Sequence, residues 1–64
     1  MPLEFKLPDM TCGHCASTVA QTCKLVDPQA KLEIDLDRRL LRVESVEDWR
    51  EFSAALAEAG YAPA

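Results

Sequence analysis

The sequence is short and contains few aromatic residues and few glycines. It has 64 residues, only 6% of them aromatic, and only two are glycines. A chain of this length buries roughly 60% of the surface that its unfolded form exposes, which is enough for one small core. We therefore expect residues 1–64 to form a single domain.

Positive charge is also scarce. Seven Lys and Arg residues stand against eleven Asp and Glu residues, which gives a formal net charge of −4. Nucleic-acid phosphates are bound by clusters of Lys and Arg, and the sequence has no such cluster. The composition therefore argues against nucleic acid as a partner.

Long hydrophobic runs are absent, and cysteines are few. No stretch approaches the length of about 20 apolar residues that a membrane-spanning helix needs, and no basic segment precedes an apolar run as in an export signal. The three cysteines are an odd and small number for a disulfide-stapled secreted domain. We expect no membrane insertion and a reducing, cytoplasmic location.

The first half of the chain shows a strand pattern followed by a helix pattern. Leu3, Phe5 and Leu7 alternate with charged residues, which is typical of a strand with one buried face, and Pro8-Asp9 ends it. From Gly13 to about Val26 a helical spacing of apolar or small residues predicts a helix, which Asp27-Pro28 then breaks. The residues on this predicted buried face are Ala16, Val19, Ala20, Cys23 and Val26.

The second half predicts a hairpin and another helix. Apolar and charged residues alternate from 31 to 36, and the polar turn 37–39 leads into a strand at 41–43. Ser45 and Asp48 have the spacing of a capping box, which predicts a helix starting at Ser45 and closed by Gly60. Its expected apolar stripe is Val46, Trp49, Phe52, Leu56 and Ala59.

The resulting order is strand, helix, strand, strand, helix, with residues 61–64 as a short tail or a fourth strand. Each strand has one apolar face and each helix one apolar stripe, so two helices should cover one face of an antiparallel sheet. We therefore predict an α+β fold of the ferredoxin-like βαββαβ type, an open-faced sandwich.

The stretch that carries chemistry lies between the first strand and the first helix. Thr11 or Cys12 can cap the helix, which would place Cys12 in the loop and Cys15 in the first turn. Both sulfurs would then face the same small volume, where the helix N-terminus favours the thiolate form that binds metal. The full stretch reads Met10-Thr11-Cys12-Gly13-His14-Cys15.

This motif in this order of elements resembles the heavy-metal-associated domain family, and within it the small bacterial copper chaperones. The resemblance also includes Val19 on the helix and Gly60-Tyr61 after the second helix. It implies a protein that binds one Cu(I) through Cys12 and Cys15 and transfers it by thiolate exchange to a domain of a copper-transporting P-type ATPase. A metal-bridged homodimer is a further state to consider.

Other metals and one other chemistry remain alternatives. Two soft thiolates suit monovalent copper, whereas a closed zinc centre needs four ligands. A carrier of mercury or zinc is kept as an alternative, with Asp9 and His14 as the only extra zinc ligands nearby. Cys-Gly-His-Cys also occurs in protein disulfide isomerases, so a dithiol oxidoreductase is a less favoured alternative. We expect a carrier and not an enzyme.

Residues around the two cysteines are expected to support the site without binding the ion. We expect Met10 to fill the core beneath the loop and His14 to be exposed, because adjacent helical residues point about 100° apart. Tyr61 either hydrogen-bonds toward a thiolate or is simply half-buried. Cys23 lies about 12 Å further along the helix and is expected in the core.

The acidic sequence also limits how a partner is recognised. No lysine-rich face surrounds the predicted metal loop, so attraction to an acidic partner is not expected. Contact with the ATPase domain is expected either through the rim of the loop or through acidic residues that meet a basic partner. The rim residues are Thr11, Gly13, His14, Ala16 and Tyr61.

Overall fold

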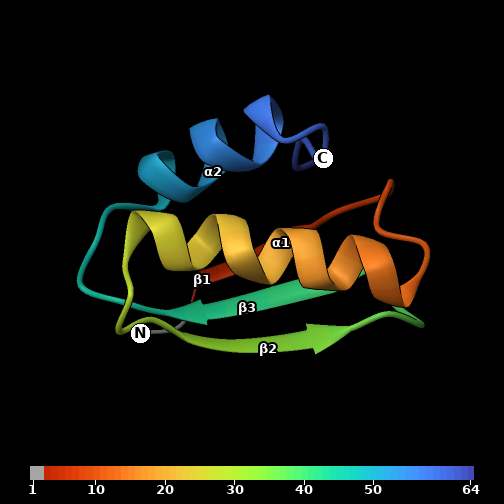
Figure 1. The fold of residues 1–64 in the computed structure, drawn as a ribbon, viewed down its shortest axis with the longest axis horizontal. Coiled ribbons are helices and arrows are strands. Elements are labelled where there is room, and N and C mark those ends of the chain that lie inside the picture. Colours follow the sequence, from red (N-terminus) through yellow and green to blue (C-terminus); the bar gives the residue numbers. More distant parts are fainter. Residues whose placement is uncertain (1–2) are drawn as a thin grey trace.

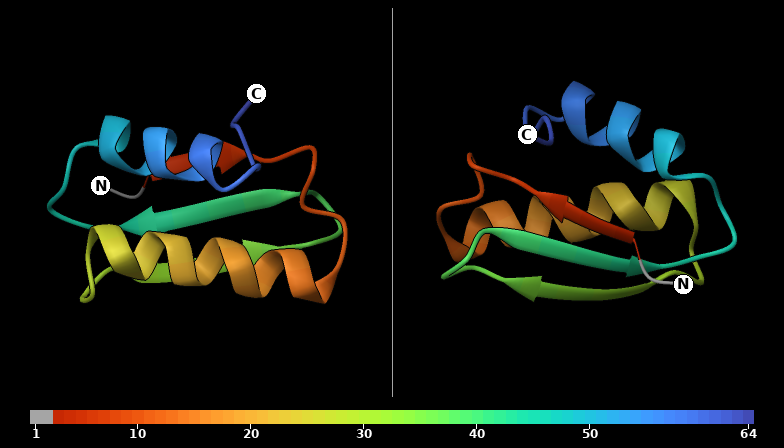
Figure 2. Two further views of the ribbon diagram at one scale, coloured as in Figure 1. Left: turned by 45° about the horizontal axis from the view of Figure 1, so that its top comes forward. Right: turned by 180° about the vertical axis from the view of Figure 1, so that it is seen from behind.

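The computed structural model describes residues 3–64 as two helices packed on one face of a three-stranded sheet (Figure 1). Its elements are β1 (Leu3–Lys6), α1 (Gly13–Val26), β2 (Lys31–Asp35), β3 (Leu40–Glu44) and α2 (Trp49–Glu58). The antiparallel sheet has the order β1-β3-β2, so β1 and β2 are both edge strands. The predicted ferredoxin-like architecture is confirmed, and the other face of the sheet is open (Figure 2).

The core forms where the apolar faces of the strands meet the stripes of the helices. On α1 the buried residues are Val19 and Cys23, and on α2 they are Phe52 and Leu56. The alternating strands contribute buried residues from β1 and β3, as the period of two predicts. Within residues 3–64 no helix is long and apolar enough to cross a bilayer.

The start of α2 differs from the prediction. The helix begins at Trp49 with Asp48 as its N-cap, and the Asp48 carboxylate accepts a hydrogen bond from the Arg50 N–H. Ser45 instead donates its hydroxyl to the Asp27 carboxylate and accepts the Glu47 N–H, which ties the end of α1 to the loop before α2. This use of Ser45 excludes it as a helix cap.

The predicted apolar stripe of α2 was therefore too long. Val46 lies in the loop and is 97% exposed, and Trp49 is 52% exposed at the first helical turn. The Arg50 guanidinium lies 5.9 Å from the centre of the Trp49 ring. Ala59 is also exposed, because it follows the last helical residue. The buried residues of α2, Phe52 and Leu56, lie in the middle of the helix.

Residues 61–64 form the predicted tail and no fourth strand. Gly60 has a φ of 93°, the left-handed conformation expected at the end of a helix. The Tyr61 N–H bonds the Leu56 carbonyl at 2.8 Å, and the Ala64 N–H bonds the Lys6 carbonyl at 2.9 Å. The tail therefore reaches the edge of β1 but makes one backbone bond to it, too few for a strand.

Candidate metal centre

The loop that precedes α1 is fixed from below and from the side. Met10 is fully buried, and its N–H bonds the Leu7 carbonyl at 3.0 Å. The Arg39 guanidinium, from the turn between β2 and β3, donates to the Pro8 carbonyl at 3.3 Å. The prediction that Met10 fills the core is confirmed, and its side chain holds the loop on the sheet.

The two cysteines of the motif lie side by side at the start of α1. Cys12 is the N-cap in an extended conformation and is exposed, while Cys15 lies in the first turn and is half-buried. Their sulfur atoms are 3.4 Å apart. Two sulfurs that each lie about 2.3 Å from one ion can be at most about 4.6 Å apart, so this spacing suits a shared metal ion.

The surroundings of Cys15 favour its thiolate form. A hydrogen bond from the Tyr61 hydroxyl, followed by bonds from the Thr11 backbone and the Cys12 side chain, lowers the pKa of Cys15 to about 6. Each donor stabilises the negative charge on sulfur, and their sum exceeds the opposing effect of burial. At neutral pH Cys15 is therefore mostly a thiolate.

Tyr61 reaches the site from the chain after α2. Its ring is half-buried and packs against the hydrophobic core, while its hydroxyl faces Cys15 and Thr18. The hydrogen bond to Cys15 raises the pKa of Tyr61, so the phenol keeps its proton and remains a donor. Tyr61 is therefore half-buried, as one of the two interpretations has it, and its role toward a metal-binding thiolate stays a prediction.

His14 and Thr11 are exposed beside the two cysteines, and Cys23 is buried in the core. Burial raises the pKa of the Cys23 thiol to about 11. Within residues 3–64 no three Cys, His, Asp or Glu side chains cluster closely enough to hold a metal. The described part of the chain thus offers two thiols at this site and no third ligand of these types.

Two residues of the site were missed in the sequence. Thr18 donates its hydroxyl to the His14 carbonyl at 3.2 Å and also lies near the Tyr61 hydroxyl. Thr18 lies one helical turn after Cys15, so its position in the sequence indicated that it is close to the motif. Arg39 supports the loop across the hairpin, and no local pattern indicates that contact.

Several solved structures have the same fold as this chain. A gold-binding protein is 42% identical, with 94% of this chain and 92% of that chain covered and a TM-score of 0.91. The copper chaperone Atx1 from Synechocystis PCC6803 is 26% identical, with 97% and 98% covered and a TM-score of 0.93. Protein Atu1203 from Agrobacterium tumefaciens is 33% identical over 100% of both chains, with a TM-score of 0.88.

No curated protein sequence matches the chain significantly. The heavy-metal-associated domain family, in contrast, matches residues 4–62, which include the loop, both helices and almost all of the sheet. The resemblance seen in the motif is therefore confirmed over nearly the whole chain, and this protein belongs to the heavy-metal-associated domain family.

Proposed function

We propose that the protein is a copper chaperone that binds one Cu(I) through the thiolates of Cys12 and Cys15. The observation that carries this proposal is the 3.4 Å separation of the two sulfurs at an exposed helix start. Soft thiolates select Cu(I), and the lowered pKa of Cys15 makes one of them available at neutral pH. The protein acts as a carrier and not as an enzyme.

The number of ligands favours copper over zinc. A structural zinc ion takes four ligands, and a catalytic one takes three and a water. Among residues 3–64 the loop supplies two thiols and no cluster of three metal-binding side chains. Zinc binding in the monomer would thus leave half of the coordination to solvent, whereas two thiolates satisfy Cu(I).

Transfer follows from the openness of the site. Cys12 is exposed, so thiolates of an acceptor can reach the ion before Cys12 and Cys15 release it. We propose that the acceptor is the metal-binding domain of a copper-transporting P-type ATPase and that the exchange takes place in the cytoplasm. The fold shared with a Synechocystis copper chaperone supports this role.

Gold is a second candidate for the ion. A protein named for binding gold is 42% identical to this chain and has the same fold. Monovalent gold is a soft ion that also accepts two thiolates, so the same sulfur pair suits it. The structure of the loop provides no ligand that would distinguish the two ions.

A competition titration tests the metal. The reduced protein is titrated anaerobically with Cu(I), Zn(II) and Au(I), separately and in pairs, and the stoichiometry is measured by mass spectrometry of the native protein. We expect one Cu(I) per chain that a large excess of Zn(II) does not displace. Preferential retention of Au(I) would support the second candidate, and displacement of Cu(I) by Zn(II) would exclude the copper proposal.

A further inference from the structure

Arg39 has a backbone conformation that arginine rarely adopts. Its φ is 57°, and within residues 3–64 no other residue apart from Gly60 has a positive φ. Glycine is the default residue for this left-handed conformation, because a Cβ there crowds the following carbonyl oxygen. The Arg39 N–H bonds the Leu36 carbonyl at 3.2 Å, which closes the turn between β2 and β3. An arginine at such a strained position points to a role for its side chain.

Arg39 contacts the metal loop, residues 7–12, which joins β1 to α1. Its carbonyl accepts the Leu7 N–H at 2.8 Å, and its guanidinium donates to the Pro8 carbonyl at 3.3 Å. The Leu7 carbonyl in turn accepts the Met10 N–H at 3.0 Å. Figure 1 and Figure 2 both show the turn between β2 and β3 beside the metal loop. Arg39 therefore holds the metal loop through its backbone and through its side chain.

The guanidinium holds the part of the metal loop that the core does not. Met10 is fully buried, whereas Pro8 and Asp9 are exposed. Among residues 3–64 no hydrogen bond reaches Pro8 or Asp9 other than the one from Arg39. Removal of this side chain therefore leaves the exposed turn without a polar anchor.

The two sulfurs depend on the metal loop to different degrees. Cys15 lies inside α1, so the helix fixes its backbone. Cys12 lies at the end of the metal loop in an extended conformation, and its side chain makes no capping bond to the helix. Opening of the metal loop therefore moves Cys12 away from Cys15.

We propose that Arg39 is a positioning residue of the metal centre, which restrains the exposed turn at Pro8 and Asp9 and so slows release of the bound ion. The role in release rests on the proposed function. The restraint itself requires no metal, so it can be measured separately from Cu(I) binding.

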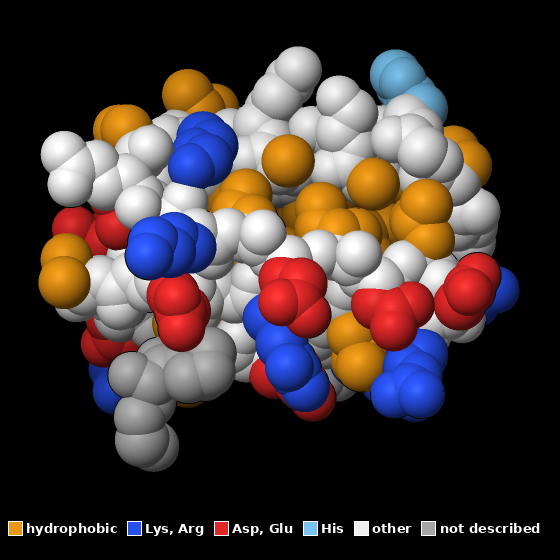
Figure 3. Space-filling view, turned by 90° about the horizontal axis from the view of Figure 1, so that it is seen from below, with side chains coloured by type: hydrophobic (Ala, Val, Ile, Leu, Met, Phe, Trp, Pro, Cys, Tyr) orange, Lys and Arg blue, Asp and Glu red, His pale blue; other side chains and the backbone are white. Residues whose placement is uncertain are grey.

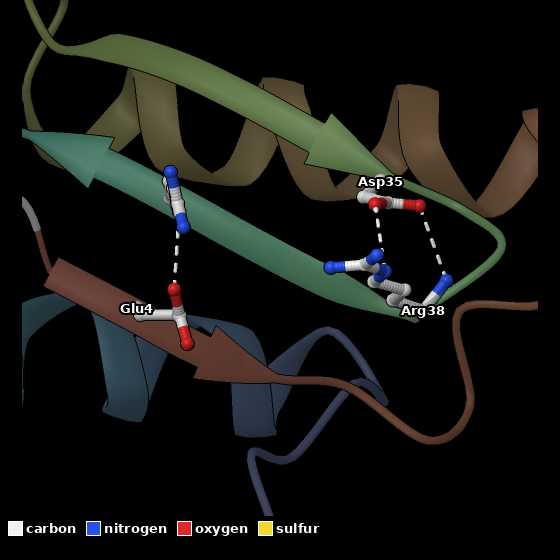
Figure 4. A network of polar contacts seen from close by, with 4 residues as sticks. Glu4, Asp35 and Arg38 are labelled. Carbon is white, nitrogen blue, oxygen red and sulfur yellow. Dashed lines mark hydrogen bonds and ion pairs between the residues drawn. The ribbon is translucent and has the colours of Figure 1, made fainter.

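The neighbouring residue Arg38 provides a matched control for charge. It belongs to the same turn, but its guanidinium lies 3.9 Å from the Asp35 carboxylate (Figure 4). Within residues 3–64 the Arg38 side chain makes no hydrogen bond to the metal loop. Lys and Arg side chains are interspersed with Asp and Glu on the face drawn in Figure 3, so either replacement removes one charge from a mixed surface.

The first test measures the metal loop in the metal-free reduced protein. Arg39→Asn keeps the carbonyl that accepts the Leu7 N–H, but its side chain is too short to reach Pro8. We expect hydrogen exchange of the Met10 N–H, followed by NMR, to become about fivefold faster, since one exposed hydrogen bond contributes roughly that factor. Arg38→Asn should change this rate by less than about twofold.

Global stability separates positioning from a purely structural role. Asparagine adopts the left-handed conformation more readily than arginine, so Arg39→Asn should have an unfolding midpoint no lower than that of the original protein. Hydrogen exchange in the sheet should also stay unchanged. A lower midpoint with faster exchange throughout the sheet would assign Arg39 to the stability of the fold and overturn the proposal.

The second test measures release of the ion. The Cu(I)-loaded protein is mixed with excess Cu(I) chelator, and transfer is followed by stopped-flow absorbance. We expect release to be about fivefold faster in Arg39→Asn and changed by less than about twofold in Arg38→Asn, with one Cu(I) per chain in each. Arg39→Lys keeps a long side chain with a donor, so its rate should lie closer to that of the original protein than to that of Arg39→Asn.

The outcomes distinguish the two proposals. Equal acceleration by Arg39→Asn and Arg38→Asn would assign the effect to charge and overturn the role of Arg39. Unchanged release, with or without faster exchange at Met10, would overturn it as well. If exchange becomes faster in Arg39→Asn but the original protein binds no Cu(I), the proposed function fails and the restraint of the metal loop stands.

Discussion

Tyr61, close to one end of the chain, places its hydroxyl against the sulfur of Cys15, close to the other. This contact is the largest cause of the lowered pKa of Cys15. The packing of α2 against α1 makes it, because Tyr61 follows α2 and Cys15 lies in the first turn of α1. The position of α2 therefore contributes to the lowered pKa of Cys15.

Removal of the Tyr61 hydroxyl should raise the pKa of Cys15. In Tyr61→Phe the thiolate loses a donor while the ring keeps its packing, so the pKa should move from about 6 toward its ordinary value of 9.0. The titration is followed by thiolate absorbance in a Cys23→Ser background. An unchanged pKa would mean that the backbone of the loop, and not Tyr61, controls Cys15.

Metal binding should weaken in mild acid. Above pH 6 Cys15 is already deprotonated, so binding of the ion releases no proton from it, whereas below pH 6 the ion must also displace the proton of Cys15 and each unit of pH should cost more affinity. Competition with a chelator of known affinity measures the metal affinity between pH 5 and pH 8. The slope of affinity against pH should change at about pH 6. A slope that is constant across this range would contradict the assignment.

Cys23 should contribute to the stability of the fold and not to metal binding. Cys23→Ser places a hydroxyl in an apolar environment where the thiol is fully buried, which should cost about 1–3 kcal/mol of unfolding free energy. Denaturant unfolding measures the loss, and Cu(I) stoichiometry should stay the same. Cys23→Ala is the control without the polar group, and loss of Cu(I) in either variant would place Cys23 in the site.

The cap of α2 can be tested by comparing two neighbouring positions. Asp48→Ala removes the side chain that accepts the Arg50 N–H and should destabilise the fold by about 1 kcal/mol. Val46→Ala is the matched control, because Val46 is 97% exposed and its truncation should change little. If Val46→Ala lowered the unfolding temperature more than Asp48→Ala, the result would contradict this cap and favour the helix start predicted at Ser45.

Ser45 should show its role through the pH dependence of stability. Its hydroxyl and the Gln29 N–H lower the pKa of Asp27 below 3.8, so this contact stabilises the fold above that pH. The stability is lost as pH falls through the folded-state pKa. Ser45→Ala should therefore unfold more easily than the original at neutral pH, and the difference should shrink below pH 3.8. A difference that persists in strong acid would contradict this origin.

The sequence predicted the elements with strong periodicity and missed contacts that depend on tertiary packing. Val19 and Cys23 are buried on α1 as their spacing indicates. Val46 and Trp49 were misassigned because Ser45 bonds Asp27, a residue at the end of the other helix. No local pattern reveals that competition for the Ser45 hydroxyl.

The proximity of Cys12 and Cys15 was predictable for a different reason. Cys12 and Cys15 are three residues apart, so their proximity follows from local helix geometry, and the structure places their sulfurs 3.4 Å apart. The role of Tyr61 depended on how α2 packs, and the sequence left it open. The loop support from Arg39 depended on the hairpin and had no local signal.

The central claim is that Cys12 and Cys15 together bind one Cu(I). The most direct measurement is the mass of the native reduced protein after addition of Cu(I) in the presence of a competing chelator. Cys12→Ser and Cys15→Ser are compared with Cys23→Ser under the same conditions. We expect one Cu(I) in the original protein and in Cys23→Ser, and none retained when either Cys12 or Cys15 is replaced. Retention of Cu(I) by Cys12→Ser or Cys15→Ser would contradict the account.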